Sequence, residues 1–311
     1  MIEEINKNKR ISAIVVTYNR KDLLRECIEA LENSSVYVDI IVIDNNSTDG
    51  TEKIARNALR KTDFYYNTMS NIGGAGGFNY GIKKAYELNY DYFWLMDDDT
   101  IVQEDTLARL LEAENLLNEE FGFLSSVAYW IDGSLCNMNY HYIAKDWNDR
   151  KEYSEYGIIK VERATFVSFF TNREVVKKIG LPRKEYFIWG DDTDYSLRIS
   201  DVFPCYMVAK SRVVHKMKNN NAAGNIATES DKERIKRMCL SIRNSRCTYR
   251  GRGIKQFFVF RLSVIRTIIQ IIASKKLVIF KIKSIICGYI QGFFFRPRIE
   301  YIDNENKTIK R

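Results

Sequence analysis

Short runs of β-branched residues alternate with helical patterns through the first hundred residues, and this alternation constrains the fold more than any other feature. A run of apolar β-branched residues predicts a buried strand, and apolar residues three and four apart predict a helix packed on it. The predicted strands and helices follow one another at 11–16, 21–33, 39–43, 51–59, 64–67, 75–88 and 92–96. Consecutive strand–helix units form parallel sheets, so the sequence predicts an α/β fold with its functional loops at the carboxyl edge of the sheet.

The rest of the chain is less regular, and it suggests three parts. A helix is predicted at 106–117, and residues 121–162 read as mixed sheet that could form a binding surface. The segment 218–230 is small, polar and without periodicity, which is typical of a mobile loop or linker. Basic helices are predicted after it, at 231–250 and within 254–295. The predicted division is a catalytic domain at 1–217, a linker at 218–230 and a basic helical region at 231–311 that associates with a membrane.

Charge is unevenly distributed along the chain. The whole chain has a formal net charge of +8, whereas residues 232–298 contain 17 basic residues and one acidic residue. The remainder is therefore acidic. This division favours an acidic catalytic body followed by a region that contacts phosphate, either on a membrane surface or in a nucleic acid.

Cysteine usage and the N-terminal sequence bear on where the protein acts. The six cysteines form no C-x-x-C pair, and the first apolar run, 11–16, is too short for a secretory signal. We therefore expect reduced thiols and a site that faces the cytoplasm. We expect no membrane-spanning helix, because basic residues interrupt the apolar C-terminal region at Arg261, Arg266, Lys275, Lys276, Lys281 and Lys283.

Three consecutive aspartates, Asp97, Asp98 and Asp99, follow the apolar strand at 92–96. Because side chains alternate in an extended backbone, Asp97 and Asp99 can point to one side and bind a divalent cation, while Asp98 points elsewhere. A solvated acidic turn is the alternative. His215 ends another apolar stretch and could complete the metal ligands, whereas the only other histidine, His141, is expected to be a packed side chain.

The glycine-rich segment 71–79 opens the helix predicted at 75–88. Glycines allow close backbone approach, and free N–H groups at a helix start can bind phosphate oxygens. The segment matches neither G-x-G-x-x-G nor a P-loop, which argues against dinucleotide and Walker-type sites. A flexible turn explains it equally well.

A second acidic cluster, in the sequence 187–195, precedes a helical pattern. We expect one of Asp191, Asp192 and Asp194 to cap that helix, and one of the others to act as a general base. The neighbouring Trp189 is suited to cover the face of a sugar.

These motifs, taken in order, resemble family 2 glycosyltransferases. The resemblance covers about residues 11–217. It is carried by VVTYNR at 15–20, VIDNNSTDGT at 42–51, NIGGAGGF at 71–78, the aspartates 97–99, WGDD at 189–192 and His215. It implies an inverting, metal-dependent enzyme with a GT-A fold, most similar to bacterial galactofuranosyltransferases that use UDP-galactofuranose. Rhamnosyltransferases that use dTDP-L-rhamnose are the next most similar.

The resemblance also implies a role for each matching residue. Asp192 matches the catalytic base, and Trp189 and Asp191 match acceptor-binding positions. Asp97, Asp99 and His215 match the ligands of Mn²⁺ or Mg²⁺. The donor-binding positions are Thr17, Arg20, Asp44, Asn46, Asn71, Gly73, Gly74, Asp97 and Asp98.

Two departures from the family pattern bear on the acceptor. Gly190 separates Trp189 from the acidic pair, whereas the polymerising galactofuranosyltransferases have tryptophan directly beside it. We also expect the chain to lack the large N-terminal sheet domain of those enzymes, and therefore to make single or few additions to a lipid-linked or cell-surface glycan.

The basic C-terminal region is expected to bind the inner face of the cell membrane. Its phenylalanines and isoleucines fall on helix faces edged by Arg and Lys, as in interfacial helices. Nucleic acid, which such basic aromatic segments can also bind, is not an expected partner, because base-stacking modules present their aromatics on a sheet or in a groove. An oligomerisation arm would explain the apolar residues but not the charge.

Overall fold

The structure is a computed structural model that describes residues 9–220 and 226–302. The first half follows the predicted alternation, with most boundaries within two residues of the prediction. Its elements are β1 (Ile11–Thr17), α2 (Lys21–Glu32), β2 (Asp39–Asp44), α3 (Thr51–Ala58), β3 (Phe64–Asn67), α4 (Gly73–Glu87), β4 (Tyr92–Asp97) and α5 (Thr106–Leu116). The expectation of an α/β fold is confirmed.

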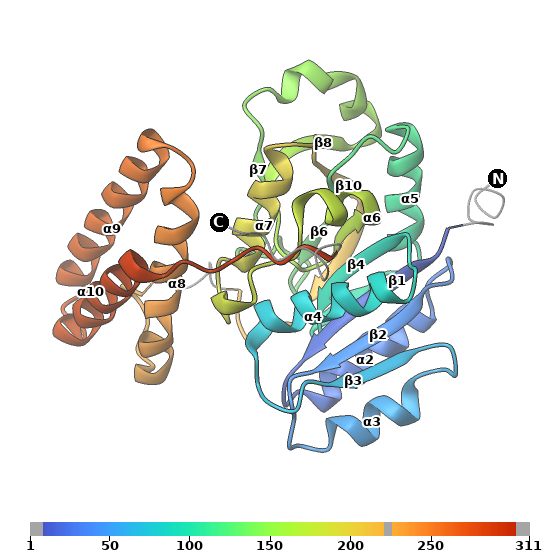
Figure 1. Ribbon diagram of the computed structural model, residues 1–311, viewed down its shortest axis with the longest axis horizontal. Helices are drawn as coiled ribbons and strands as arrows, with labels where there is room; N and C mark the ends of the chain where they lie inside the picture. The colour runs from blue at the N-terminus through green and yellow to red at the C-terminus, as the bar shows by residue number, and fades with distance from the viewer. Residues whose placement is uncertain (1–8, 221–225, 303–311) are drawn as a thin grey trace, which may run out of the picture.

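The described strands form one mixed sheet whose first half is parallel (Figure 1). Its order is β3-β2-β1-β4-β9-β6-β10-β8-β7, and β5 pairs with β10. The later strands are β5 (Thr100–Val102), β6 (Phe123–Tyr129), β7 (Tyr142–Ile143), β8 (Ile158–Arg163), β9 (Phe169–Asn172) and β10 (Tyr206–His215). Strands β3, β2, β1 and β4 run parallel, and β9 is antiparallel to both β4 and β6.

Helices cover both faces of the sheet, so successive residues of a strand are buried on opposite sides. Ala13 and Val15 of β1 belong to the core that includes residues of α2, α3 and α5. Ile14 and Val16 face the core that includes residues of α4, α6 (Arg173–Ile179) and α7 (Asp191–Ser200). A strand buried on both faces needs a continuous apolar sequence, which is why these runs were recognisable.

Helix α4 packs unusually close to β1, and its glycines make this possible. A Cβ atom at Gly81 would lie 2.4 Å from Ile14, and one at Gly77 would lie 2.6 Å from Val16. The helix begins at Gly73 rather than at residue 75, so the glycines are part of the helix and not of a loop before it. Part of the glycine-rich motif therefore serves helix–strand packing.

Three C-terminal helices lie side by side next to the sheet domain, drawn in orange and red in Figure 1. They are α8 (Lys232–Arg250), α9 (Ile254–Ser274) and α10 (Val278–Phe294). The predicted helical region 254–295 is two helices, because the chain turns at Lys275 and Leu277, both with positive φ. Phe260 and Val264 of α9 share a small core with Ile235 of α8 and Ile285 of α10. We call α8, α9 and α10 the three-helix unit.

The chain after α10 returns to the sheet domain (Figure 1). The N–H of Leu181 donates to the carbonyl of Glu300 (2.8 Å), and the Glu300 carboxylate pairs with Lys83 and Lys184 at 3.2 and 3.1 Å. Gly180 lies against Ile299, since a Cβ atom at Gly180 would be 2.6 Å from that side chain. The last described residues of the predicted helical region thus pack on the catalytic body.

Both ends of the predicted linker make defined contacts. The side chain of Asn220 accepts from the N–H of Asn137 (2.8 Å), and Ile226 and Ala227 are buried in the core of the three-helix unit. Residues 221–225 of that linker lie outside the described residues, as do 303–311 of the helical region.

Helix α9 has the length and composition that could cross a membrane. It is 21 residues long with a mean hydropathy of 1.7, although Arg261 and Arg266 interrupt it. The core helix of a soluble protein often passes the same test, but only 17% of the apolar window of α9 is buried. Contrary to our expectation, the interrupting charges therefore do not remove α9 from the helices that could span a membrane by length and composition.

Candidate active site

Polar residues end three neighbouring parallel strands at one edge of the sheet. Thr17 at the end of β1 pairs in register with Asp44 of β2, and Val16 pairs with Asp97 of β4. Because the strands are parallel and in register, their carboxyl ends meet, and three positions that are far apart in sequence become neighbours. The structure thus places these predicted site residues together at the carboxyl edge of the sheet.

Asp97, Asp99 and His215 come together at this edge. Each offers a ligand atom, and these atoms lie within 4.8 Å of one another. Strand β5, which follows the aspartates, pairs antiparallel with the end of β10, so Thr100 lies opposite His215. That pairing brings the histidine to the carboxylates from more than a hundred residues away.

A hydrogen bond to Asn139 sets the orientation of His215. Its Nδ1 lies 2.8 Å from Oδ1 of Asn139, a carbonyl oxygen that can only accept, so Nδ1–H donates. The amide of Asn139 is oriented by donating to Thr165 (2.7 Å). The other nitrogen, Nε2, then faces Oδ1 of Asp99 at 3.1 Å. Either a proton or a metal ion at Nε2 would make this contact favourable.

Electrostatics at the cluster favour a bound cation. Burial and the charge of Asp99 raise the pKa of Asp97 to about 7. Burial lowers the pKa of His215, but its hydrogen bond to Asp99 and the surrounding carboxylates outweigh this and raise it to about 10. Burial also disfavours ionised Asp99, yet the adjacent His215 and Arg20 hold the pKa of Asp99 below its usual range. Carboxylates are preferred ligands of Mg²⁺ and Mn²⁺, and a divalent cation would relieve this repulsion. The residues present therefore fit a divalent cation.

Asp98 is not part of the group formed by Asp97, Asp99 and His215, but it does not point away from Asp99 as predicted, because the same nitrogen of Arg20 contacts both carboxylates. It accepts a hydrogen bond from the hydroxyl of Thr17 (2.7 Å) and pairs with Arg20 (3.2 Å). Arg20 also pairs with Asp99 at 2.6 Å. Burial raises the pKa of Asp98 to about 6, although Arg20 opposes the shift. Three of the predicted donor-binding residues, Thr17, Arg20 and Asp98, thus form one connected group that braces the acidic turn.

The predicted nucleotide positions on β2 differ in burial. Asp44 is fully buried and accepts from the Tyr65 hydroxyl (2.6 Å), whereas Asn46 is exposed with φ of 63°. The sequence reasoning missed Asn45, which donates to the carbonyl of Gly73 (3.2 Å) and so joins the β2 loop to the start of α4. The sequence signal that could have identified Asn45 is its position between Asp44 and Asn46, which were both predicted to bind the donor.

At the start of α4, the glycines contact protein. The side chain of Asn71 accepts from the N–H of Gly73 (2.9 Å), and the N–H of Ala75 donates to the carbonyl of Phe187 (3.2 Å). A Cβ atom at Gly73 would lie 2.1 Å from that carbonyl oxygen, while one at Gly74 would meet nothing within 4 Å. Two of the N–H groups expected to be free for phosphate are therefore already bonded.

Helix α7 begins at the second acidic cluster. The residue before it is Gly190, with φ of 83°, and no side chain caps the helix, so the expectation that an aspartate does so was wrong. Asp194 is a structural residue instead: it is buried, pairs with Arg183 and Arg198, and accepts from the Tyr186 hydroxyl.

Asp191 and Asp192 remain as the candidate chemical groups in this cluster. Asp191 is buried and Asp192 is half-buried. Burial raises the pKa of both carboxyls, and the charges of Asp192 and of Asp97 raise that of Asp191 further. The acidic groups of β4 and α7 therefore interact electrostatically.

Trp189 is half-buried and packs against the core of the three-helix unit.

The other histidine, His141, lies 2.8 Å from the Ser125 hydroxyl, and burial lowers its pKa to about 4. It stays with the packed side chains, as expected.

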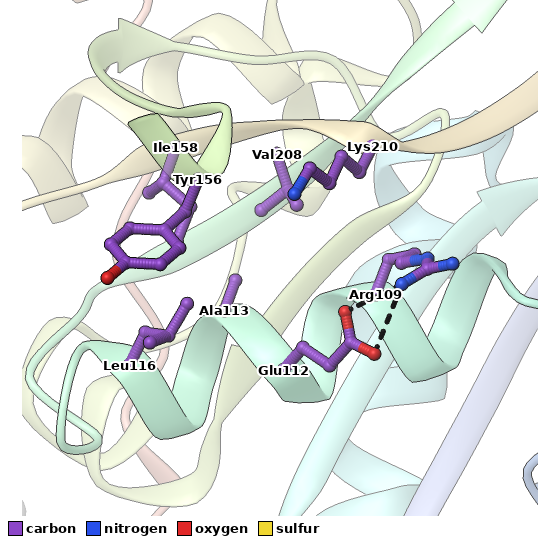
Figure 2. Close-up of a pocket in the computed structure, with 8 residues that line it drawn as sticks. All are labelled: Arg109, Glu112, Ala113, Leu116, Tyr156, Ile158, Val208 and Lys210. Atoms are coloured by element: carbon purple, nitrogen blue, oxygen red, sulfur yellow. Dashed lines mark hydrogen bonds and ion pairs between the residues drawn. The ribbon is translucent and has the colours of Figure 1, made fainter. Parts of the chain in front are cut away.

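A small pocket elsewhere on the molecule is separate from this site. It has a volume of about 90 Å³ and is lined by Tyr156 and by residues of α5, β8 and β10 (Figure 2). Arg109 and Glu112 form an ion pair on its rim, and none of its lining residues belongs to the acidic clusters.

Comparison with known proteins agrees with this geometry. The profile of the family described as Glycosyl transferase family 2 matches residues 12–180, more than half the chain. Galactofuranosyltransferase GlfT1 of Mycolicibacterium smegmatis is 36% identical over 91 residues, which are 29% of this chain and 30% of that protein. Abequosyltransferase RfbV of Salmonella typhimurium is 33% identical over 106 residues, 32% and 31% of the two chains. The matches thus span about a third of the length of these relatives.

Solved structures share the fold at low sequence identity. Mannosyltransferase PcManGT of Pyrobaculum calidifontis, solved with GDP-Man and Mn²⁺, has a TM-score of 0.55 at 15% identity, covering 92% of this chain and 75% of that one. GalNAc-T7, solved with UDP, GalNAc and Mn²⁺, has the same TM-score and identity over 76% and 50% of the two chains. Both are GT-A glycosyltransferases. From its sequence family, its sheet and the acidic edge of that sheet, this chain belongs to glycosyl transferase family 2 and is a glycosyltransferase with a GT-A fold.

Proposed function

We propose that the protein is an inverting, divalent-metal-dependent enzyme that transfers a sugar from a nucleotide donor to a hydroxyl of a glycan acceptor. The observation that supports this most is the meeting of Asp97, Asp99 and His215 at the carboxyl edge of the sheet, with ligand atoms within 4.8 Å of one another. Asp97, Asp99 and His215 would hold Mn²⁺ or Mg²⁺. The bound cation would supply neutralisation of the charge that develops on the leaving diphosphate.

In this proposal Asp192 is the general base. It takes the proton of the acceptor hydroxyl as that oxygen bonds to the anomeric carbon, while the bond from this carbon to the diphosphate breaks on the opposite face. One bond forms and one breaks in a single displacement, so the configuration inverts. Burial raises the pKa of Asp192, which makes its carboxylate a better proton acceptor than an exposed aspartate.

Other side chains would position the two substrates. The acceptor would lie against Trp189 and Asp191. The donor would contact Thr17, Arg20, Asp44, Asn46, Asn71, Gly73, Gly74, Asp97 and Asp98. Because Thr17 and Arg20 already hold Asp98, we propose that their main contribution is to keep the acidic turn in place rather than to move during the reaction.

The proposed donor is UDP-galactofuranose, with dTDP-L-rhamnose as the second candidate. Support comes from the glycine-rich segment and the two acidic motifs in their observed order, and from the likeness to GlfT1 proteins over about a third of the chain. Relatives of similar identity are named for other sugars, among them abequose and glucose.

A donor panel tests the assignment. Purified protein is incubated with Mn²⁺ and, separately, with UDP-galactofuranose, UDP-galactopyranose, UDP-glucose and dTDP-L-rhamnose, and release of the nucleotide is followed. We expect release from UDP-galactofuranose that exceeds release from the pyranose donors and is abolished by chelation. Turnover of a pyranose nucleotide sugar alone would refute galactofuranose, and absence of release from every donor would count against the transferase proposal itself.

We further propose that the acceptor is a lipid-linked glycan, met at the inner face of the cell membrane by a cytoplasmic, peripheral enzyme. A 29% identical relative in Campylobacter jejuni is named for adding glucose to an undecaprenol-linked glycan, over 34% of this chain and 35% of that protein. The basic three-helix unit next to the site would suit a surface that presents such an acceptor.

A further inference from the structure

Helix α9 exposes a row of apolar side chains along most of its length. These residues are between 49% and 61% exposed, although all are large and apolar. The row consists of Phe258, Leu262, Ile265, Ile269 and Ile272. Their spacing of four and three residues places them on one stripe along the helix axis. The opposite side of α9 is the side buried in the three-helix unit, through Phe260, Val264 and Ile271.

Positive side chains flank this α9 row on both sides. Lys255, Arg261 and Arg266 are exposed. At about 100° per residue, each lies roughly 60–80° from the centre of the row, Lys255 and Arg266 on one side and Arg261 on the other. Residues 251–299 contain no aspartate or glutamate. The charged residues of α9 and α10 are therefore all cationic.

This charge decides between the possible occupants of the row. A second copy of the chain would bring Arg261 and Arg266 against the same cations, and like charges across a helix seam are unfavourable. An anionic lipid surface would instead accept the apolar row at the level of its acyl chains and the cations at its head groups.

An orientation in which α9 spans the bilayer is unfavourable, both for α9 itself and for the adjacent helix α8. Arg261 and Arg266 would enter the hydrocarbon, where charged side chains are costly. The polar helix α8, which packs alongside α9, carries Arg243, Arg246 and Arg250 and would be drawn in with it.

We propose that α9 docks flat on an anionic membrane surface, with its apolar row facing the lipid. This inference stands on the row and its flanking charges, independently of the sugar that is transferred. Docking through α9 would also set the orientation of the enzyme relative to the membrane, because α8 lies between α9 and the loop that carries Trp189.

Vesicle binding by the full chain tests the docking. Co-sedimentation is measured with vesicles of phosphatidylcholine alone and of phosphatidylcholine with phosphatidylglycerol. We expect binding to the anionic vesicles, weakened at least about tenfold by the double variant Ile265→Glu, Ile269→Glu. Removing two charges with Arg261→Gln, Arg266→Gln should weaken it about fivefold per charge, hence about 25-fold. The matched control is Ile131→Glu, which changes an isoleucine of the catalytic body that is 58% exposed.

Three results would overturn the docking proposal. One is equal binding by the row variant and the wild type. Another is a lipid-free dimer, detected by light scattering, that the row variant dissociates, which would make a second copy the occupant. The third is protein that is released from membranes only by detergent, whatever the salt or the charge variant, which would indicate that α9 crosses the bilayer.

A separate observation concerns Asn244 of α8, whose side chain is fully buried against the loop before α7. Its Nδ2 lies 3.0, 3.1 and 2.8 Å from the carbonyl oxygens of Tyr186, Ile188 and Trp189. The adjacent Arg243 donates to the carbonyl of Tyr186 as well (3.1 Å). One amide group thus contacts three carbonyl oxygens within the four residues 186–189, in the loop that ends at Asp191.

That loop needs external support, because its backbone is strained. Phe187 and Trp189 have φ of 64° and 65°, a region that residues other than glycine seldom occupy. On its other side, the carbonyl of Phe187 accepts from the N–H of Ala75 at the start of α4. The loop is therefore held between α4 and Asn244, directly before the proposed base.

We infer that Asn244 is a positioning residue, which sets the geometry of Trp189, Asp191 and Asp192 toward the acceptor. This inference rests on the proposed function. Small displacements of a reacting group cost a large factor in rate, so loss of the amide should affect the transfer step more than donor binding.

The test separates kinetic parameters in Asn244→Leu, which keeps a similar volume without the donor. We expect kcat for transfer to fall about 10–100-fold, while the donor KM, Mn²⁺ affinity and slow donor hydrolysis by water stay near wild type. The matched control is Arg252→Ala, which removes the paired contacts of 2.6 and 2.7 Å to Asp201 but leaves the loop untouched.

Arg243→Gln provides a milder second variant if Asn244→Leu fails to fold, and a smaller fall in kcat is expected from it. If Asn244→Leu folds and has the wild-type kcat, the inference is wrong. If only Arg243→Gln folds, a wild-type kcat in that variant would overturn the inference. So would a uniform loss of every parameter together with a lower Tm. A wild-type chain without any transferase activity would instead defeat the proposed function.

Discussion

Asp192→Asn is expected to lower the rate of transfer by about 10²–10⁴-fold, the range that a positioned general base contributes. The amide keeps the shape of the side chain but cannot take the acceptor proton. Since Asp192 is not among Asp97, Asp99 and His215, binding of donor and metal should be unchanged. The measurement is kcat for sugar transfer alongside calorimetric binding of the nucleotide sugar in the presence of Mn²⁺.

The pH profile gives a second measurement of the same role. A base works only when deprotonated, so kcat/KM should fall as pH falls through the pKa of Asp192. Burial raises that pKa, and the acid limb should therefore lie above the ordinary aspartate value of about 3.9. Asp191→Asn is the neighbouring comparison. Near-normal turnover in Asp192→Asn, with Asp191→Asn inactive, would move the base one residue upstream.

Asp99→Ala is expected to abolish metal-dependent donor binding and, with it, transfer. Asp99 offers a ligand atom within the cluster and also pairs with both His215 and Arg20, so its loss removes a ligand and the carboxylate beside His215, while Arg20 keeps its contact with Asp98. Mutations of residues that hydrogen-bond to metal ligands typically cost about 10–100-fold in metal affinity, and loss of a direct ligand should exceed that. Mn²⁺ binding is measured directly by electron paramagnetic resonance, apart from activity.

Two further variants make the result interpretable. Asp99→Asn keeps the size of the side chain and should also lose Mn²⁺ affinity, which separates ligand loss from collapse of the site. Asp132→Ala removes an exposed carboxylate of the catalytic body and should bind Mn²⁺ normally. Full activity and unchanged Mn²⁺ binding in Asp99→Ala would show that the metal assignment is wrong.

Local sequence predicted the elements that bury both faces of a parallel sheet. Strands β1, β2 and β4 are continuous apolar runs because helices cover them on either side, and their helices repeat apolar residues on one face. Strands β6, β8 and β9 escaped individual recognition. Their residues mix buried apolar and polar side chains, as in Ser125 and Ser126 of β6, which are buried through hydrogen bonds made to distant partners.

Part of the candidate site could be predicted from the sequence for the same reason. Carboxylates directly after a buried strand indicate the carboxyl edge of a sheet, so Asp97 and Asp99 were identifiable, and the ordered motifs pointed to His215. The roles of Asn139 and Asn244 left no such signal, because an isolated asparagine reveals nothing of the histidine or loop that it will contact.

The sequence by itself determined the strand and helix periodicities, the clustering of charge, and the polar residues that end each parallel strand, since these depend on neighbours a few residues away. Tertiary structure decided which distant groups meet. Pairing of β5 with β10 brings His215 to Asp99, helix α8 supports the loop before Asp191, and α4 starts in contact with Phe187 rather than with open space. Such contacts depend on the free energy of packing the whole chain, and no local pattern of residues specifies them.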